Sequence, residues 1–229
     1  MKKKILGVLL TLVVIFSVLT LNSCENNREY DEEVVKACAL DLIKKSVSLN
    51  DIYYGAGITY EENESLAIGP YYPADALSLK SFGIRTVDEL KEKTAEVFSS
   101  ELTRIIFDTK LNTLYDSDEV IRAYTRYYQT YTEGDNPQPE YFMVYKDAEI
   151  FLKDKVTYNY DTLVVKESRG EIVYVEIEVK VETDDGKSQT KTIEVGLIEE
   201  ADGWRLSSPT YTSYVDLDYY NQLQNKNQK

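Results

Sequence analysis

The chain of 229 residues contains no histidine, two cysteines and one tryptophan. The lack of histidine excludes mechanisms that use an imidazole as general base, nucleophile or metal ligand. Two cysteines are too few for a disulfide framework or for a zinc site with four Cys and His ligands. Basic residues are also scarce, with 26 Lys and Arg against 40 Asp and Glu and a formal net charge of −14. We therefore expect no nucleic-acid partner, because phosphate contacts need clustered basic residues, and we predict no cofactor and no bound metal.

A single long apolar run stands at the N-terminus. Lys2, Lys3 and Lys4 precede an uncharged segment over residues 5–21. A positive start followed by an apolar core is typical of a secretory signal. The run is about 17 residues long, at the short limit for crossing a bilayer, so a retained transmembrane anchor is the alternative.

The end of this run, Leu21-Asn22-Ser23-Cys24, resembles the lipobox of bacterial lipoproteins. The resemblance implies that residues 1–23 are a signal peptide that is removed, and that Cys24 becomes the lipidated N-terminus on the extracytoplasmic face of the cell membrane. Residues 24–30 are polar and would form a short tether. Loss of the three lysines leaves 23 basic against 40 acidic residues, a net charge of −17. Anionic lipids would repel such a domain, so the lipid must hold it at the membrane.

The mature chain begins with helical patterns. An apolar stripe over 31–50 predicts an amphipathic helix that ends near Asn50 and buries Cys38 as a small apolar residue. Thr86 and Glu89 have the spacing of a capping box, so a helix begins there. Ser99 or Ser100 would cap a further short helix. The long connection over 51–85 is expected to be mostly irregular, interrupted by a short amphipathic piece around 74–82.

The second half of the chain has the pattern of strands. Val173, Val175, Ile177, Val179 and Val181 alternate with polar residues, and further strands are predicted over 141–145, 156–166, 190–198 and 204–206. Alternation is lost near residue 161, which indicates a bulge. The predicted fold is α+β, with N-terminal helices packed on a curved antiparallel sheet in one domain over 31–209. Residues 210–229 would form a polar tail whose last residues are disordered.

Two sets of residues are candidates for binding a partner. The first set is two tyrosine pairs in the irregular region, Tyr53-Tyr54 and Tyr71-Tyr72. Tyrosine joins an apolar ring to a hydroxyl, which suits protein and glycan surfaces, although it also favours strands. The second set is the acidic side of the strand over 172–182, represented by Glu176, Glu178 and Glu182. Acidic residues on one face either keep the protein soluble or dock to a basic cleft of a partner.

The layout resembles that of firmicute DL-endopeptidase inhibitors, which restrain peptidoglycan hydrolases. The similarity lies in the capped helix that leads to Val97-Phe98-Ser99, the tyrosine-rich middle and a late meander ending in Gly203-Trp204-Arg205. The segment over 50–58 is similar to uncharacterised lipoproteins of the same bacteria. The resemblance implies a cystatin-like or NTF2-like domain that binds, and inhibits, a cell-wall hydrolase without being an enzyme. The alternatives are a small-molecule or glycan-binding lipoprotein with a pocket between sheet and helices, and a carboxylate-dependent hydrolase.

Overall fold

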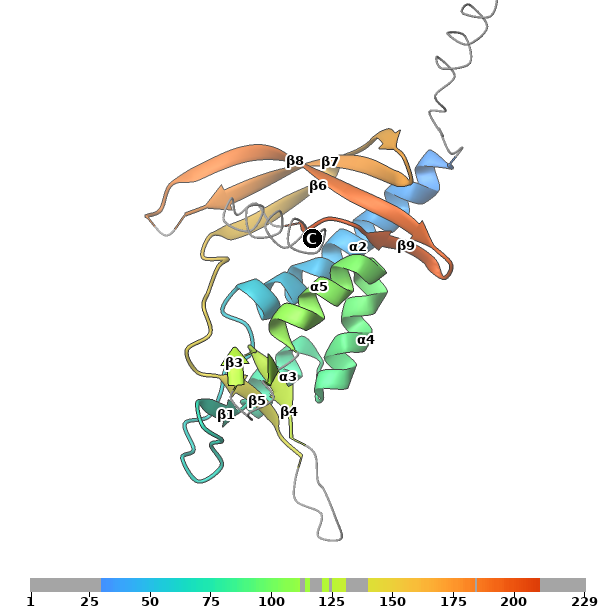
Figure 1. The fold of residues 1–229 in the computed structure, drawn as a ribbon. Coiled ribbons are helices and arrows are strands. Elements are labelled where there is room, and N and C mark those ends of the chain that lie inside the picture. The colour runs from blue at the N-terminus through green and yellow to red at the C-terminus, as the bar shows by residue number, and fades with distance from the viewer. Residues whose placement is uncertain are drawn as a thin grey trace, which may run out of the picture.

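The structure is a computed structural model that describes residues 30–111, 114–115, 121–123, 125–130, 140–183 and 185–210. Helices precede the long strands, so the predicted α+β class is confirmed. The helices are α2 (Glu32–Tyr54), α3 (Ala76–Phe82), α4 (Val87–Val97) and α5 (Ser100–Lys110). The strands are β1 (Tyr71–Pro73), β2 (Leu114–Tyr115), β3 (Ile121–Ala123), β4 (Tyr127–Gln129), β5 (Phe142–Tyr145), β6 (Lys155–Arg169), β7 (Ile172–Glu182), β8 (Ser188–Glu200) and β9 (Gly203–Leu206). The helices gather below one face of a sheet built from the last four strands (Figure 1).

The large sheet is an antiparallel meander in the order β6-β7-β8-β9. The β7–β8 register is unbroken from Ile172 opposite Ile198 to Glu182 opposite Ser188. As predicted, the odd-numbered residues of β7 from 173 to 181 are buried, whereas its even-numbered residues are half-buried or exposed. The buried face lies against α2, which packs on both β6 and β9. The apolar face of the sheet is therefore covered by the first helix of the domain, as the sequence predicted.

The edge strand β6 is irregular. Its register with β7 shifts between Asn159 and Val164, which confirms the bulge predicted near residue 161. The hydroxyl of Thr162 stabilises this bulge, because it donates to Asn159 O at 2.7 Å and accepts from Glu178 N at 2.9 Å. A bulge increases local twist, which accounts for the curvature of the sheet in Figure 1.

Helix α2 is one turn longer than predicted. The Asp31 carboxylate caps its start, and the chain passes through Asn50 to end at Gly55. Asn50 does not stop the helix because its side chain is buried and donates to Thr210 Oγ1 at 2.7 Å. Cys38 is a free cysteine, half-buried rather than fully buried, because it lies at the margin of the stripe centred on Val35 and Ala39.

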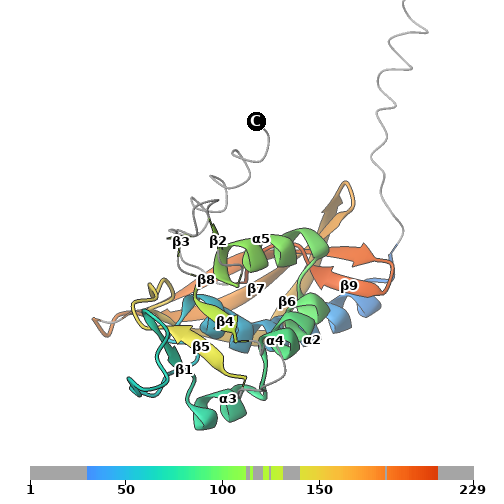
Figure 2. The same ribbon diagram turned by 60° about the horizontal axis from the view of Figure 1, so that its bottom comes forward.

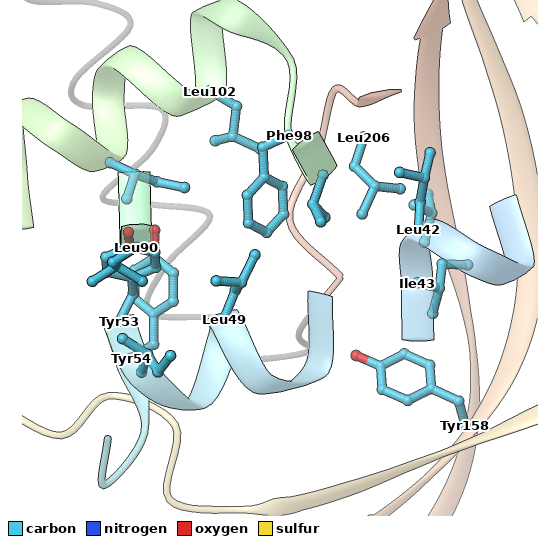
Figure 3. Packing of buried hydrophobic residues seen from close by; sticks show 14 of the residues in the cluster. Leu42, Ile43, Leu49, Tyr53, Tyr54, Leu90, Phe98, Leu102, Tyr158 and Leu206 are labelled. Carbon is cyan, nitrogen blue, oxygen red and sulfur yellow. The ribbon is translucent and has the colours of Figure 1, made fainter. Parts of the chain in front are cut away.

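Helices α4 and α5 complete the main core. Ser99 is the N-cap of α5, and its backbone N–H donates to Leu206 O in β9 at 2.8 Å. This bond ties the junction between the two helices to the last strand. Phe98, just before it, lies between Leu102 of α5 and Leu49 of α2 (Figure 3).

A second, three-stranded sheet was not predicted. Its order is β1-β5-β4, and Tyr72 in β1 lies opposite Val144 in β5. The sequence predicted only β5 clearly and placed residues 71–73 in the irregular connection over 51–85. The small sheet lies at the end of the domain where α2 terminates, whereas the first turn of α2 lies at the other end (Figures 1 and 2).

A buried arginine joins the small sheet to α2. The Arg126 side chain, only 6% exposed, donates to Tyr53 O at 3.1 Å, Gly55 O at 2.6 Å and Ala56 O at 3.0 Å. Its Nε donates to the hydroxyl of Tyr127 at 2.9 Å, and that hydroxyl donates to a carbonyl in the last turns of α2. The guanidinium therefore satisfies carbonyl groups at the negative end of the helix dipole.

A glycine makes room for this arrangement. Gly57 has φ 66°, and a Cβ there would lie 2.4 Å from the Tyr127 hydroxyl and 2.7 Å from Nη2 of Arg126. Any side chain at this position would therefore displace the arginine as well as strain the backbone.

The C-terminal part of the described chain enters the core. Thr210, the residue at which the polar tail was predicted to begin, is fully buried. Its hydroxyl lies 2.7 Å from Ser46 Oγ and accepts from Asn50, while its carbonyl accepts from the hydroxyl of Tyr158. Thr210 therefore belongs to the domain; the remaining tail residues, like the predicted signal peptide and Cys24, lie outside the described residues.

Candidate functional site

The four tyrosines proposed as binding residues lie inside the domain. Tyr53 and Tyr54 form the last turn of α2 with exposed fractions of 0% and 8%, and Tyr71 and Tyr72 form β1 with 3% and 7%. Their hydroxyl groups have internal partners: Tyr53 pairs with Thr94 at 2.8 Å, and Tyr71 donates to a carbonyl just before β4. In this structure they stabilise the core and the small sheet instead of forming a surface for a partner.

The acidic residues of β7 lie on the outer face of the large sheet, as predicted. Glu176 is 3.2 Å from Lys166 Nζ in the neighbouring strand β6. Lys180 donates to Glu182 at 2.5 Å, and this hydrogen bond lowers the pKa of Glu182. Glu178, the third candidate, is half-buried on the same face.

The same face also carries cations from β6. Arg169 binds Glu194 of β8 at 2.9 Å, and its guanidinium lies 4.3 Å from the centroid of the Tyr174 ring. The outer face of the large sheet therefore carries both acidic and basic side chains, not acidic ones alone. The pattern of the strand over 172–182 did not reveal this, because the compensating arginine and lysine come from the preceding strand.

A groove between α3 and α4 is a better candidate for binding a partner. Helix α3 begins at the cap Asp75 and ends at Gly83, whose φ is 64°. The chain then turns through buried Ile84 into the N-cap Thr86 of α4. The two helices enclose an open hollow of about 830 Å³, which we call the α3–α4 groove; it is lined by Ala76, Leu79, Lys80, Gly83, Ile84, Arg85, Glu89, Glu92, Lys93 and Glu96.

The α3–α4 groove has an apolar floor and charged margins. Its lining holds three carboxylates of α4 and three cations, and among these Arg85 and Glu89 form an ion pair, with Nη2 to Oε1 at 2.6 Å. The hydrogen bond from Arg85 lowers the pKa of Glu89 and raises the pKa of the guanidinium. Leu77, which follows the lining residue Ala76 in the first turn of α3, is 76% exposed. An open apolar surface bordered by both charges suits a folded or extended protein segment.

The sequence predicted the elements that form this groove, but it did not predict the groove itself. The capping box at Thr86 was predicted and is confirmed, since its hydroxyl accepts from Glu89 N at 3.1 Å. Glu89 itself accepts from the N–H of Arg85, one residue before the cap. The glycine three residues before the cap, together with the short amphipathic piece over 74–82, was the available signal for a helix–turn–helix corner.

Comparisons with known proteins give no family for the chain: no family model and no curated protein matches it. In the part of the chain that the structure describes, no three His, Cys, Asp or Glu side chains are grouped so that they could hold a metal ion. Among the same residues, no helix has the length and apolar character needed to cross a membrane.

Proposed function

We propose that the chain is a lipid-anchored protein of the bacterial envelope that binds a protein partner through the α3–α4 groove and has no catalytic activity of its own. The observation that carries this proposal is that the two ends of α2 lie next to different parts of the molecule. The helix has 23 residues and so spans about 35 Å. Its first turn follows closely on Cys24, whereas its last turn is fixed to the small sheet, from which α3 emerges.

Lipidation at Cys24 would therefore attach the membrane near the first turn of α2, at the end of the domain away from α3. The eight residues from Cys24 to Asp31 extend to at most roughly 29 Å, so the first turn of α2 would stay within that distance of the bilayer. The resemblance to DL-endopeptidase inhibitors makes a cell-wall hydrolase the first class of partner to test.

The anchor is tested by Cys24→Ser in the host. Wild-type protein is expected to incorporate labelled fatty acid and to enter the detergent phase on phase partition. The variant lacks the thiol that would carry the acyl chains, so it should lose the label, whereas the uncleaved apolar run over 5–21 can still hold it in the detergent phase. Equal labelling of both forms would contradict lipidation at this residue.

The binding surface is tested with the full lipidated chain in mild detergent and the wall hydrolases of its host. Wild-type protein is expected to bind one hydrolase and slow its release of muropeptides, more weakly at high salt. The double change Glu92→Lys and Glu96→Lys should weaken binding at least tenfold by reversing one margin of the α3–α4 groove.

The matched control is the double change Glu167→Lys and Glu178→Lys, which alters the net charge equally on the outer face of the large sheet. It should leave binding within twofold of wild type. Loss of binding in the sheet variant alone would move the site to that face, and binding to purified glycan without any hydrolase would overturn the proposal of a protein partner.

A further inference from the structure

Strand β8 has one edge that is paired over only part of its length. On the side of β7, its residues 188–198 lie in an unbroken register. On the other side, β9 pairs with residues 197–200 (Figure 1), and the chain then turns into the core at Thr210. The remaining stretch over 188–195, about 24 Å long on the basis of roughly 3.4 Å per residue, has no strand beside it in the described part of the chain. We call this stretch the free edge of β8.

The backbone groups that point to the free edge are identified by the bonds of Gly196. Its N–H donates to a hydroxyl and its C=O accepts from an N–H of the two serines that follow β9, at 2.8 and 2.9 Å, so both groups point away from β7. Because the direction alternates along a strand, the N–H and C=O groups of Glu194, Thr192 and Thr190 point the same way. These three residues are exposed, and among the described residues no backbone group bonds to them from this side.

The free edge lacks the features that protect other sheet edges. Natural edge strands are guarded by bulges, prolines or charged side chains. β6, at the opposite edge of the same sheet, has two register shifts. The free edge of β8 has neither a register shift nor a proline, and its only charged residues are Lys191 and Glu194. Unpaired backbone groups on a regular strand of this kind are a template for one more strand.

The side chains along the free edge indicate which strand would pair with it. Thr190, Thr192 and Glu194 lie opposite the outward-facing residues of β7, whereas Ile193 and Val195 lie opposite its buried residues. An added strand therefore needs polar residues on one face and apolar residues on the other. The formal net charge of −14 would repel an anionic segment and attract a cationic one. We propose that the free edge of β8 binds an extended basic segment of another protein, which adds an antiparallel strand to the large sheet.

A second copy of this chain is a less suitable occupant. Pairing β8 with itself would bring together two domains of the same large negative charge, whereas a basic segment compensates that charge. No residue of β8 lines the α3–α4 groove, so the two surfaces are separate. The proposal therefore does not depend on the partner proposed for that groove.

A synthetic peptide tests the free edge directly. The labelled peptide Lys-Val-Thr-Val-Lys-Val-Thr is titrated with the full chain in mild detergent while fluorescence anisotropy is recorded. Saturable binding is expected, and a peptide with glutamate in place of both lysines should bind at least tenfold more weakly. Methylation of the backbone nitrogens of the Lys and Thr residues, which would face β8, should abolish binding. Methylation of the Val nitrogens, which would point away from β8, should leave it within threefold.

Two substitutions at one position locate the binding on the chain. Thr192→Pro removes the N–H that points to the free edge and spares the ladder with β7, in which that N–H takes no part. It should weaken binding of the peptide at least tenfold. Thr192→Val, which keeps the N–H, should leave binding within threefold. In the wild-type chain, hydrogen exchange of the Thr192 amide should slow when the peptide is bound.

Several results would overturn the proposal. They are the absence of saturable binding, equal binding of the lysine and glutamate peptides, equal binding of the two methylated peptides, and equal affinities of the two Thr192 variants. The methylated peptides keep the test decisive if Thr192→Pro does not fold, because they need only the wild-type chain. A wild-type dimer in sedimentation that Thr192→Pro abolishes would assign the free edge to a second copy and would likewise overturn it.

Discussion

Arg126 carries its charge in the interior of the domain. Its guanidinium donates to backbone carbonyls at the end of α2 and to the carbonyl of Glu149. Arginine suits this role because its planar group offers five donors in a fixed arrangement, whereas lysine offers three on a flexible stem. One side chain thereby determines how the small sheet sits on the long helix.

Arg126→Met should lower the free energy of unfolding by about 3 kcal/mol, because several buried carbonyls lose their donors and each costs about 1 kcal/mol or more. Urea unfolding followed by circular dichroism measures the change. Arg104→Met is the matched control: this exposed arginine makes one i,i+4 pair with Asp108, worth about 0.5 kcal/mol or less. Similar losses for the two variants would refute the role given to Arg126.

The two buried tyrosine pairs show where prediction from the sequence was insufficient. The side chain is compatible with a core or with a surface, so the pairs 53–54 and 71–72 did not reveal their burial. The spacing of Ser46, Leu49, Asn50 and Tyr53 does continue the stripe of α2, and extending the helix by one turn would have placed the first pair inside. For β1 no such local signal exists, because its partner β5 follows about seventy residues later.

Elements with a local period were predicted well. The alternation of β7, the bulge in β6 and the cap at Thr86 each depend on residues close in the sequence. The α3–α4 groove was not predicted, because it forms where separate elements meet. The bulged, charged β6 also has the features by which natural sheets protect an edge strand from pairing with another chain.

The junction of α4 and α5 offers a test at this scale. The sequence left open whether Ser99 or Ser100 caps α5; in the structure the hydroxyl of Ser99 accepts from Leu102 N, and Ser100 binds Glu200 at the surface. Ser99→Ala should cost about 1 kcal/mol of stability. Ser100→Ala should cost less than half of that, as measured by thermal unfolding; the reverse order would contradict the assignment.

The whole molecule should lose stability in alkali. Burial raises the pKa of Tyr158 from 10.0 to about 12, and burial also raises the pKa of Tyr53 and Tyr127. The unfolded chain releases these protons near pH 10, before the folded chain does. Their stabilising effect is therefore complete below pH 10 and is lost as the pH rises toward 12, with about 2–3 kcal/mol from Tyr158 alone.

Urea midpoints at pH 9 and pH 11, with tyrosinate absorbance followed in parallel, measure this loss. In Tyr158→Phe the midpoint should fall less steeply between the two pH values, although its stability at pH 9 is also reduced by the missing bond to Thr210. Parallel slopes for the two proteins would show that Tyr158 does not control the alkaline transition.

The burial of Thr210 has a consequence for the order in which the protein is made. This threonine, nineteen residues from the C-terminus, bonds to Ser46 and Asn50 near the start of the domain. β9, completed at Leu206, likewise pairs with the chain at Phe98. The core around Ser46 and Asn50 therefore cannot be completed until Thr210 has been synthesised, so the helices that are made first wait for the last strand before they can pack fully.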